Sequence, residues 1–286
     1  MDTASTFQCG DEKLVGILSA PAAPGSVGAL ILVGGPQYRI GSHRQFLLLA
    51  RHLADSGIAV LRFDFRGMGD STGAPAKFDE TVPDITAAID ALKRMCPAVR
   101  RVVLWGLCDG ASAALLYWRA TRDPRIAGMV LLNPWIRSEQ SLASTHVKHY
   151  YSKRVFERQF WAKLARGGID VRGAVQGFLS ALHTATRGSE GSATGREASF
   201  QDRMATALAG FAGPVLIILS GQDYTAKEFI EYAESSPRWN GLIGRKNVYR
   251  VDLPKADHTF STAAWRHEVE RLTADWLARV FPADVK

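Results

Sequence analysis

The sequence predicts an α/β fold, a mostly parallel, doubly wound sheet of about eight strands with helices between them. Two observations predict it. Short apolar runs of strand length, such as 29–33, 58–63 and 214–219, recur along the chain and alternate with segments whose apolar residues follow helical spacing. The alternation stops once, from Trp135 to Phe211, which predicts a helical insertion after the sixth main strand.

The first elements follow in order from the N-terminal part of the chain. Gly and Pro clusters separate them. We expect two short strands within 5–20 about the turn Cys9-Gly10-Asp11, a strand at 29–33, a helix at 43–56 ended by Gly57, a strand at 58–63, and a helix at 82–95 ended by Cys96-Pro97.

The same alternation continues through the rest of the chain, apart from the insertion. We expect a strand from Arg101 into the turn at Gly106, a helix at 111–119, a strand at 128–132, a strand at 214–219, a helix at 226–233, a strand at 247–253, and a terminal helix through Val269, Leu272, Trp276 and Val280. Ligands of such sheets bind beyond the carboxyl ends of the strands.

The pattern also predicts the domain organisation. Residues 1–134 and 211–286 form the predicted core, and 135–210 form a helical lid over the site, with a flexible Gly/Ser-rich stretch near 187–199. The alternative is a helical insertion that makes no contact with substrate.

Composition narrows the class of protein. The chain has 286 residues, 47% hydrophobic and 22% charged, which is typical of a soluble globular protein. No apolar run reaches the length of a membrane span, and residues 1–20 show no signal-peptide pattern. Three widely spaced cysteines argue against a disulfide framework or a metal site, so we expect no metal, no cofactor and a cytoplasmic location.

The net charge of +7 leaves two interpretations open. It could indicate an anionic partner, or only a generally basic surface. The chain has no nucleic-acid motif, so we expect a small-molecule or acylated substrate and no nucleic acid. Peripheral contact with a membrane surface and the oligomeric state stay open.

The segment Gly106-Leu107-Cys108-Asp109-Gly110 carries the main chemical signal. An apolar strand enters this turn and a small-residue helix leaves it, which is the pattern of a nucleophile elbow with cysteine in place of serine. Such a turn holds the nucleophile in a strained conformation at the carboxyl edge of the sheet, and the helix start favours a thiolate. The alternative is an ordinary tight turn with a buried, inert cysteine.

A catalytic cysteine needs a base, normally a histidine held by a carboxylate. Asp223 follows the predicted strand 214–219, and His258 follows the last predicted strand, so the order is nucleophile, acid, histidine. Asn133, at another position where an acid can stand, carries no charge. We therefore predict a triad of Cys108, Asp223 and His258; Asp223 as a helix cap and His258 as a surface residue are the alternatives.

Acyl transfer also needs two N–H donors for the substrate oxygen. We expect the first from Asp109 and the second from the loop after strand 29–33, where Pro36 has no N–H. Gln37 is the first choice and Gly35 the reserve. Further substrate contacts are expected from side chains on loops of the same edge, although Arg66 could instead brace its own loop through Asp64 or Asp70. These side chains are Tyr38, Arg39 and Arg66.

These motifs resemble a known superfamily, the α/β-hydrolases, along almost the whole chain. More narrowly, the segments 34–39, 41–44 and 106–112 look like the exosortase-A-system-associated hydrolases, type 1. That resemblance implies an α/β-hydrolase fold and a hydrolase linked to bacterial exopolysaccharide production and envelope protein sorting. The Gly-x-Cys-x-Gly turn is also similar to that of dienelactone hydrolases, which lack a large helical lid.

Cysteine chemistry narrows the reaction. After a thiolate adds to an amide, the adduct expels sulfur more readily than the amine, so esters, thioesters and lactones are the expected substrates. We predict a hydrolase that forms an acyl-cysteine intermediate on Cys108. Two other classes stay open: an acyltransferase that delivers the acyl group to a hydroxyl, and a non-catalytic binding protein that retains the fold.

Overall fold

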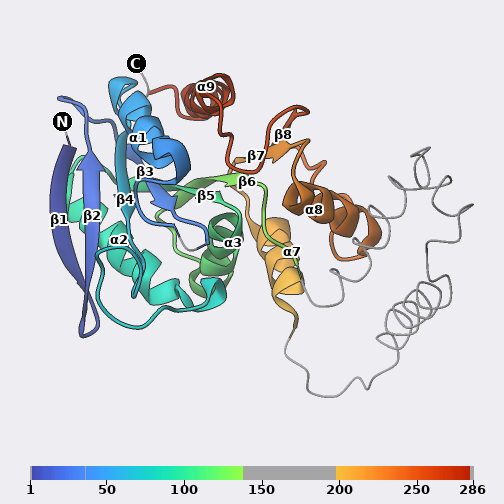
Figure 1. The fold of residues 1–286 in the computed structure, drawn as a ribbon, viewed down its shortest axis with the longest axis horizontal. Coiled ribbons are helices and arrows are strands. Elements are labelled where there is room, and N and C mark those ends of the chain that lie inside the picture. The colour runs from blue at the N-terminus through green and yellow to red at the C-terminus, as the bar shows by residue number, and fades with distance from the viewer. Residues whose placement is uncertain (1, 36, 138–197, 284–286) are drawn as a thin grey trace, which may run out of the picture. The chain divides into compact units, whose positions relative to one another are not determined.

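The computed structural model describes residues 2–35, 37–137 and 198–283 (Figure 1). The contacts divide the chain into two compact units, 1–136 with 198–286, and 137–197. Most of the lid predicted at 135–210, and most of its Gly/Ser-rich stretch, lie outside the described residues.

The described residues form one eight-stranded sheet, in the order β1-β2-β4-β3-β5-β6-β7-β8. The first two strands pair antiparallel, β2 pairs antiparallel with β4, and all later neighbours are parallel. The strands are β1 (Asp2–Cys9), β2 (Glu12–Ser19), β3 (Val27–Leu32), β4 (Ala59–Phe63), β5 (Arg101–Leu107), β6 (Ile126–Leu132), β7 (Val215–Ser220) and β8 (Val248–Leu253). The predicted fold class is confirmed.

Helices cover both faces of this sheet. In Figure 1, α1 and α9 lie on one side of it, and α2, α3, α7 and α8 on the other. The helices are α1 (Gln45–Asp55), α2 (Val82–Met95), α3 (Asp109–Thr121), α7 (Phe200–Gly210), α8 (Tyr224–Ser235) and α9 (Ala263–Val280), with short 3₁₀ turns η1 (Ser42–Arg44) and η2 (Phe78–Glu80).

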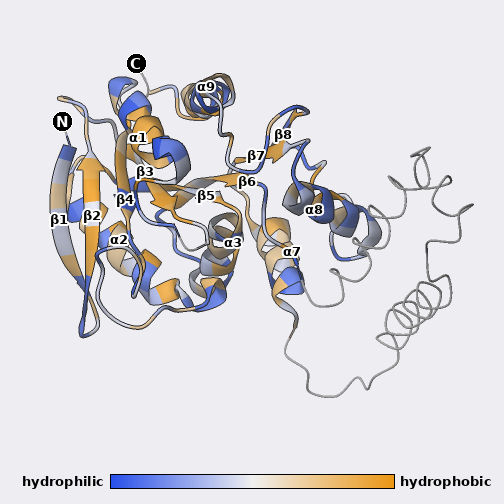
Figure 2. Ribbon diagram, viewed as in Figure 1, coloured by the Kyte–Doolittle hydropathy of each residue, from blue (hydrophilic) through white to orange (hydrophobic). Residues whose placement is uncertain are grey.

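The sequence explains why the sheet is central. Every residue of β3, β4 and β7 is buried, as expected for parallel strands that are covered on both faces. In Figure 2, β2 and β4 are drawn mainly in hydrophobic colours, whereas α8 and α9 are mostly hydrophilic. The core is therefore the sheet with the inner faces of its helices.

Helix α7 corrects a boundary of the predicted insertion. The sequence predicts a lid that extends to residue 210, but α7 packs against α3 in the core unit. Directly after α7, the ring of Phe211 lies 5.1 Å from that of Trp118 in α3, edge to face. Within α7, the Gln201 carbonyl accepts from the Trp239 side-chain N–H at 3.2 Å. The core therefore resumes at Ala198, because the apolar face of α7 is buried there.

The parallel strands place the chemistry at one edge. The carboxyl ends of β3, β4, β5, β6, β7 and β8 meet at the same edge, and each is followed by a loop that carries one of the residues singled out above. Nowhere in the described part of the chain does a helix combine the length and apolar character that crossing a bilayer requires.

Candidate active site

The turn between β5 and α3 has the geometry of a nucleophile elbow. Cys108 adopts φ 60° and ψ −125°, a region that residues other than glycine rarely occupy. The two flanking glycines are needed for close packing. A Cβ on Gly106 would come within 2.4 Å of the Gly110 backbone, and one on Gly110 within 2.4 Å of the Leu32 carbonyl oxygen. The turn therefore holds the cysteine at the carboxyl end of β5.

Neighbouring backbone fixes Cys108 from two sides. Its N–H donates to the Leu132 carbonyl at 2.9 Å, and its carbonyl accepts from the Trp135 N–H at 3.1 Å. The thiol is free and half-buried, whereas the thiols of Cys9 and Cys96 are buried. Among the three cysteines, only Cys108 combines a strained turn with access to solvent.

His258 and Asp223 approach this turn from the loops after β8 and β7. The Nδ1 atom of His258 lies 2.8 Å from Asp223 Oδ2. Asp223 is buried, and its carboxylate also accepts from the backbone N–H groups of Thr225 at 3.0 Å and Ala226 at 3.2 Å. The side chain thus caps α8 and is also bonded to the imidazole.

The electrostatics of His258 link the three side chains. Its hydrogen bond with Asp223, and then one with the Cys108 side chain, raise the pKa of His258 to about 10. Because Nδ1 is engaged by Asp223, Nε2 is the ring nitrogen left for the bond with Cys108. An imidazolium in this position favours a thiolate beside it. The structure thus brings together the three residues that the sequence order singled out.

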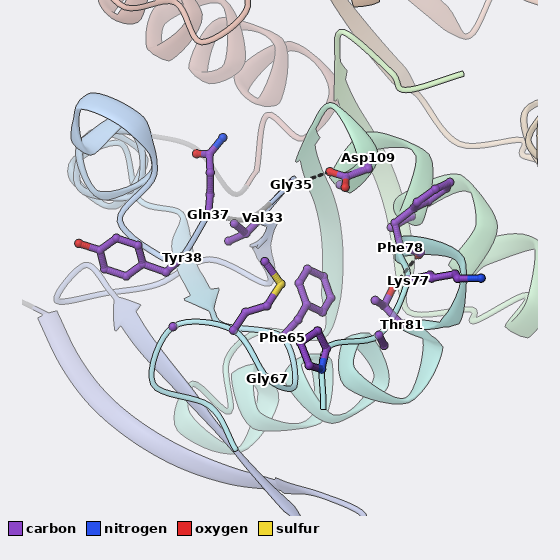
Figure 3. Close-up of a pocket in the computed structure, with 16 residues that line it drawn as sticks. Val33, Gly35, Gln37, Tyr38, Phe65, Gly67, Lys77, Phe78, Thr81 and Asp109 are labelled. Atoms are coloured by element: carbon purple, nitrogen blue, oxygen red, sulfur yellow. Dashed lines mark hydrogen bonds between the residues drawn. The ribbon is translucent and has the colours of Figure 1, made fainter. Parts of the chain in front are cut away.

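Asp109 joins the elbow to the loop after β3. Its Oδ1 accepts from the Gly35 N–H at 2.5 Å (Figure 3). Burial raises the pKa of Asp109, against the opposing effect of the backbone N–H groups of Gly35 and Gly110. Gly35, the reserve oxyanion donor, therefore has its N–H directed at a carboxylate. The Gln37 side chain accepts from the Ser42 N–H at 3.1 Å, which orders the same loop.

A cavity of about 690 Å³ adjoins the elbow on the side of Asp109. Its walls are largely apolar, and Tyr38 and Gln37 belong to its lining (Figure 3). Neither Cys108 nor His258 lines it; the cavity begins beside Cys108, at the first turn of α3. Apolar walls next to a reactive centre are typical of sites for small organic ligands. The apolar lining residues include Val33, Phe65, Met68, Phe78 and Ala113.

Arg39 and Arg66 lie outside that lining. Arg39 is paired with Asp64, and its Nη2 lies 2.5 Å from Asp70 Oδ2. Arg66 donates to the fully buried Asp84 through Nε at 3.0 Å and Nη2 at 2.9 Å. The structure places both guanidinium groups in ion pairs that brace loops of the core; for Arg66, the partner is Asp84 and not Asp64 or Asp70.

One polar residue of the site was missed by sequence reasoning. Asn133, considered only as a position that carries no charge, bonds to Ser220 and to the His258 carbonyl. A buried Asn at the end of a strand is the signal that could have indicated it. Among the described residues, no group of three or more His, Cys, Asp or Glu side chains is placed to hold a metal ion.

The fold and the elbow define the class of protein: the chain is an α/β-hydrolase. It belongs to the family described as serine aminopeptidase, S33, whose profile matches residues 28–176. That description names a serine enzyme, and this chain carries Cys108 at the elbow.

Two curated relatives match parts of the chain. Human protein ABHD12B is 36% identical over 83 residues, 29% of this chain and 22% of that protein. The uncharacterized protein RP471 of Rickettsia prowazekii is 29% identical over 132 residues, 45% of this chain and 53% of that protein. The chain thus spans about a fifth and about half of the lengths of these relatives.

Solved structures share the fold. The Pyrococcus furiosus esterase Pf2001 superposes with a TM-score of 0.64 at 18% identity, over 98% of this chain and 93% of that one. Est1E from Butyrivibrio proteoclasticus, solved with ferulic acid bound, gives 0.62 at 16% identity, over 98% of this chain and 100% of that one. At such identities the likeness concerns the fold alone.

Proposed function

We propose that this α/β-hydrolase cleaves an ester, thioester or lactone through a covalent acyl-cysteine on Cys108. The observation that carries the proposal is the convergence of a cysteine in a strained elbow with the His258 and Asp223 pair, whose Nδ1 to Oδ2 distance is 2.8 Å. A nucleophile, a base and a group that orients the base are the three parts that covalent acyl transfer needs.

The first half-reaction transfers the acyl group to sulfur. The Cys108 thiolate attacks the substrate carbonyl carbon, a C–S bond forms, and the carbonyl electron pair moves onto oxygen. We assign the backbone N–H groups of Asp109 and Gln37 to this oxyanion, since the Gly35 N–H is directed at the Asp109 carboxylate. As the adduct collapses, the leaving oxygen or sulfur takes the proton from Nε2 of His258.

The second half-reaction releases the acyl group to water. Neutral His258 accepts a proton from a water molecule through Nε2 while the water oxygen attacks the thioester carbon. The C–S bond then breaks, a carboxylic acid leaves, and the thiolate and imidazolium pair is restored. Asp223 stabilises the charged ring in both halves, which the raised pKa of His258, about 10, reflects.

Cysteine in place of serine favours activated acyl groups over peptides. Sulfur is a better leaving group than an amine, so an amide adduct returns to substrate unless the amine is protonated first. Esters, thioesters and lactones do not have this problem, because an alkoxide or thiolate leaves more readily than an unprotonated amine. The apolar cavity of about 690 Å³ beside the elbow suits the neutral acyl part of such substrates.

We propose the biological setting from the motif resemblance alone. The segments 34–39, 41–44 and 106–112 are those that resemble the exosortase-A-system-associated hydrolases, so a role in bacterial exopolysaccharide production or envelope sorting, from the cytoplasm, is the corresponding hypothesis. Deletion of the gene should then change the amount or acylation of exported polysaccharide. Unchanged polysaccharide would remove this setting while leaving the chemistry intact.

Active-site labelling tests the chemistry. The chain is incubated with p-nitrophenyl acetate and with an acyl thioester, quenched in acid, and mapped by mass spectrometry. We expect one acyl group on Cys108 and none in Cys108→Ala. Cys9→Ala and Cys96→Ala are matched controls, because both thiols are buried, and should acylate like the unmodified chain. Acylation that persists in Cys108→Ala would refute the assignment.

A further inference from the structure

Asn133 occupies a constrained position directly after β6. Its side chain is fully buried, and its backbone has φ 43°, in the left-handed region that asparagine tolerates better than most residues. It lies between the ends of β5 and β7 in the strand order, so its neighbours are the strands that lead to Cys108 and Asp223. A polar side chain in such a place is stable only if its hydrogen bonds are made.

Its amide makes those bonds to the last residue of β7 and to the loop that follows β8. Oδ1 accepts from the Ser220 N–H at 2.9 Å, and Nδ2 donates to Ser220 Oγ at 2.9 Å and to the His258 carbonyl at 3.2 Å. The Ser220 hydroxyl in turn donates to the Asp257 carbonyl at 2.8 Å. Two consecutive carbonyls of the histidine loop are therefore held by one buried network.

The backbone on either side of Asn133 holds the nucleophile. The Leu132 carbonyl accepts from the Cys108 N–H at 2.9 Å, and the Trp135 N–H donates to the Cys108 carbonyl at 3.1 Å. Ser112, in α3, donates through its hydroxyl to the Trp135 carbonyl at 2.6 Å. The segment 132–135 thus bonds to Cys108 through its backbone and to the His258 carbonyl through the Asn133 side-chain amide.

We infer that Asn133 is a positioning residue that sets where the His258 imidazole lies relative to the Cys108 sulfur. The inference rests on the proposed function, in which proton transfer between these two side chains is required. Asparagine suits the role because it both donates and accepts. An isosteric aspartate keeps one acceptor but loses both donors, and its charge faces the His258 carbonyl oxygen.

Asn247 is the matched control for a purely structural role. Its Nδ2 also donates to two loop carbonyls, those of Phe211 at 3.1 Å and Gly213 at 2.7 Å. It precedes β8, however, at the amino ends of the parallel strands, whereas Asn133 follows β6 at their carboxyl ends. The two variants Asn133→Ala and Asn247→Ala therefore remove comparable bonds at opposite edges of the sheet.

The test compares these variants with Asn133→Asp and Ser220→Ala. Four quantities are measured: the melting temperature, the kcat and the KM for p-nitrophenyl acetate, and the rate of Cys108 alkylation by iodoacetamide between about pH 5 and pH 10. A misplacement of about 1 Å in a catalytic group can cost about 10²-fold in rate. We expect Asn133→Ala and Asn133→Asp to lower kcat by about that factor with little change in KM, and Ser220→Ala to lower it less.

The alkylation profile is the readout that a structural role would not move. In the unmodified chain and in Asn247→Ala, we expect the same pH profile of Cys108 alkylation. In folded Asn133→Ala and Asn133→Asp, the profile should shift to slower alkylation at acidic pH, because the His258 imidazolium no longer lies in place to stabilise a thiolate. Ser220→Ala retains the bond from Nδ2 to the His258 carbonyl, and so provides a milder variant if the Asn133 variants do not fold.

The outcomes separate this inference from the proposed function. If the unmodified chain alkylates at low pH but hydrolyses no ester, the proposed reaction fails while the alkylation arm still tests Asn133. The inference is overturned if the Asn133 variants keep the unmodified profile and kcat, or if Asn247→Ala produces the same shift. An unchanged profile in Ser220→Ala, with both Asn133 variants unfolded, would also count against it.

Discussion

His258 Nδ1 lies 2.8 Å from Asp223 Oδ2, and the same carboxylate accepts from the Thr225 and Ala226 N–H groups at the start of α8. One side chain therefore has a capping role and an electrostatic role. The two roles respond differently to substitution, because an asparagine can still cap a helix but carries no charge to stabilise an imidazolium.

Asp223→Asn should separate them. We expect its kcat for an ester to fall by about 10³-fold to 10⁴-fold, the loss seen when the acid of a catalytic triad becomes an amide. Its melting temperature should stay close to that of the unmodified chain. Asp223→Ala should lose activity to the same extent and also about 1 kcal/mol of stability, through loss of the cap. Kinetics and thermal unfolding of both variants check this.

Ser199→Ala is the control for capping alone. Ser199 caps α7 through its hydroxyl, which accepts from the Asp202 N–H at 3.2 Å. Its loss should reduce stability by about 1 kcal/mol without an effect on kcat. If Asp223→Asn hydrolyses esters as fast as the unmodified chain, the carboxylate is a cap and nothing more.

The raised pKa of His258 makes stability depend on pH. The hydrogen bond with Asp223, and then that with Cys108, raise the value from 6.5 to about 10. Folding therefore favours the protonated ring. The contribution of His258 to the free energy of unfolding is fully present below about pH 6.5 and is lost as the pH rises through about 10. The difference in melting temperature between the unmodified chain and His258→Gln should thus be greatest near about pH 6 and close to zero above about pH 10.5.

Subtracting the variant removes the effects of other groups that titrate at high pH, because those groups are common to both proteins. A difference that grows with rising pH would mean that the folded ring is neutral. In that case the thiolate and imidazolium pair would have to be abandoned as the resting state.

Much of the fold could be predicted from the sequence, because the spacing of apolar residues indicates the helices and strands and the Gly and Pro clusters indicate where they end. The helix at 82–95 has the predicted bounds, and the strand predicted at 247–253 is observed as Val248–Leu253. Helix α7 shows the limit of this reasoning. Its sequence is recognisably helical, but periodicity does not show that its apolar face packs on α3, so the sequence alone predicts that it belongs to the insertion.

The candidate site was likewise predictable only in part. Chain order and strand ends are enough to select Cys108, Asp223 and His258, since parallel strands bring their carboxyl ends to one edge. The partners of Asn133 and Asp109 depend on which loops meet in space. The contact from Asp109 to Gly35 joins residues 74 positions apart, and no local sequence pattern predicts it.

The ion pair of Arg66 with Asp84 provides a third prediction. Asp84 is fully buried and receives Nε, Nη2 and the backbone N–H of Arg66. Arg66→Ala leaves a buried carboxylate without its guanidinium, which should lower the free energy of unfolding by about 3 to 5 kcal/mol. Urea denaturation measures it. Arg271→Ala, at an exposed pair with Glu268, should leave stability unchanged.

The same variant tests the substrate contact that the sequence suggested for Arg66. If the role is structural, folded Arg66→Ala keeps the KM of the unmodified chain at low temperature. A raised KM with unaltered stability would instead place the guanidinium on the substrate.

The approach of the loop after β3 to the elbow provides the last prediction. A Cβ on Gly34 would come within 2.1 Å of the Leu107 carbonyl oxygen and 2.6 Å of Asp109 Oδ1. Gly34→Ala must therefore push this loop away from the elbow and break the bond from Gly35 to Asp109. Because Gln37, the proposed second oxyanion donor, follows in the same loop, we expect about a 10²-fold fall in kcat, the loss typical of one missing donor.

Gly10→Ala is the control for this prediction. Gly10 has φ +60° with no atom within 4 Å of an added Cβ, so only backbone strain of about 1 kcal/mol results, without loss of activity. Asp109→Asn, which keeps an acceptor oxygen for the Gly35 N–H, should retain more activity than Asp109→Ala. Equal rates in these two variants, with Gly34→Ala fully active, would show that the loop does not supply the donor.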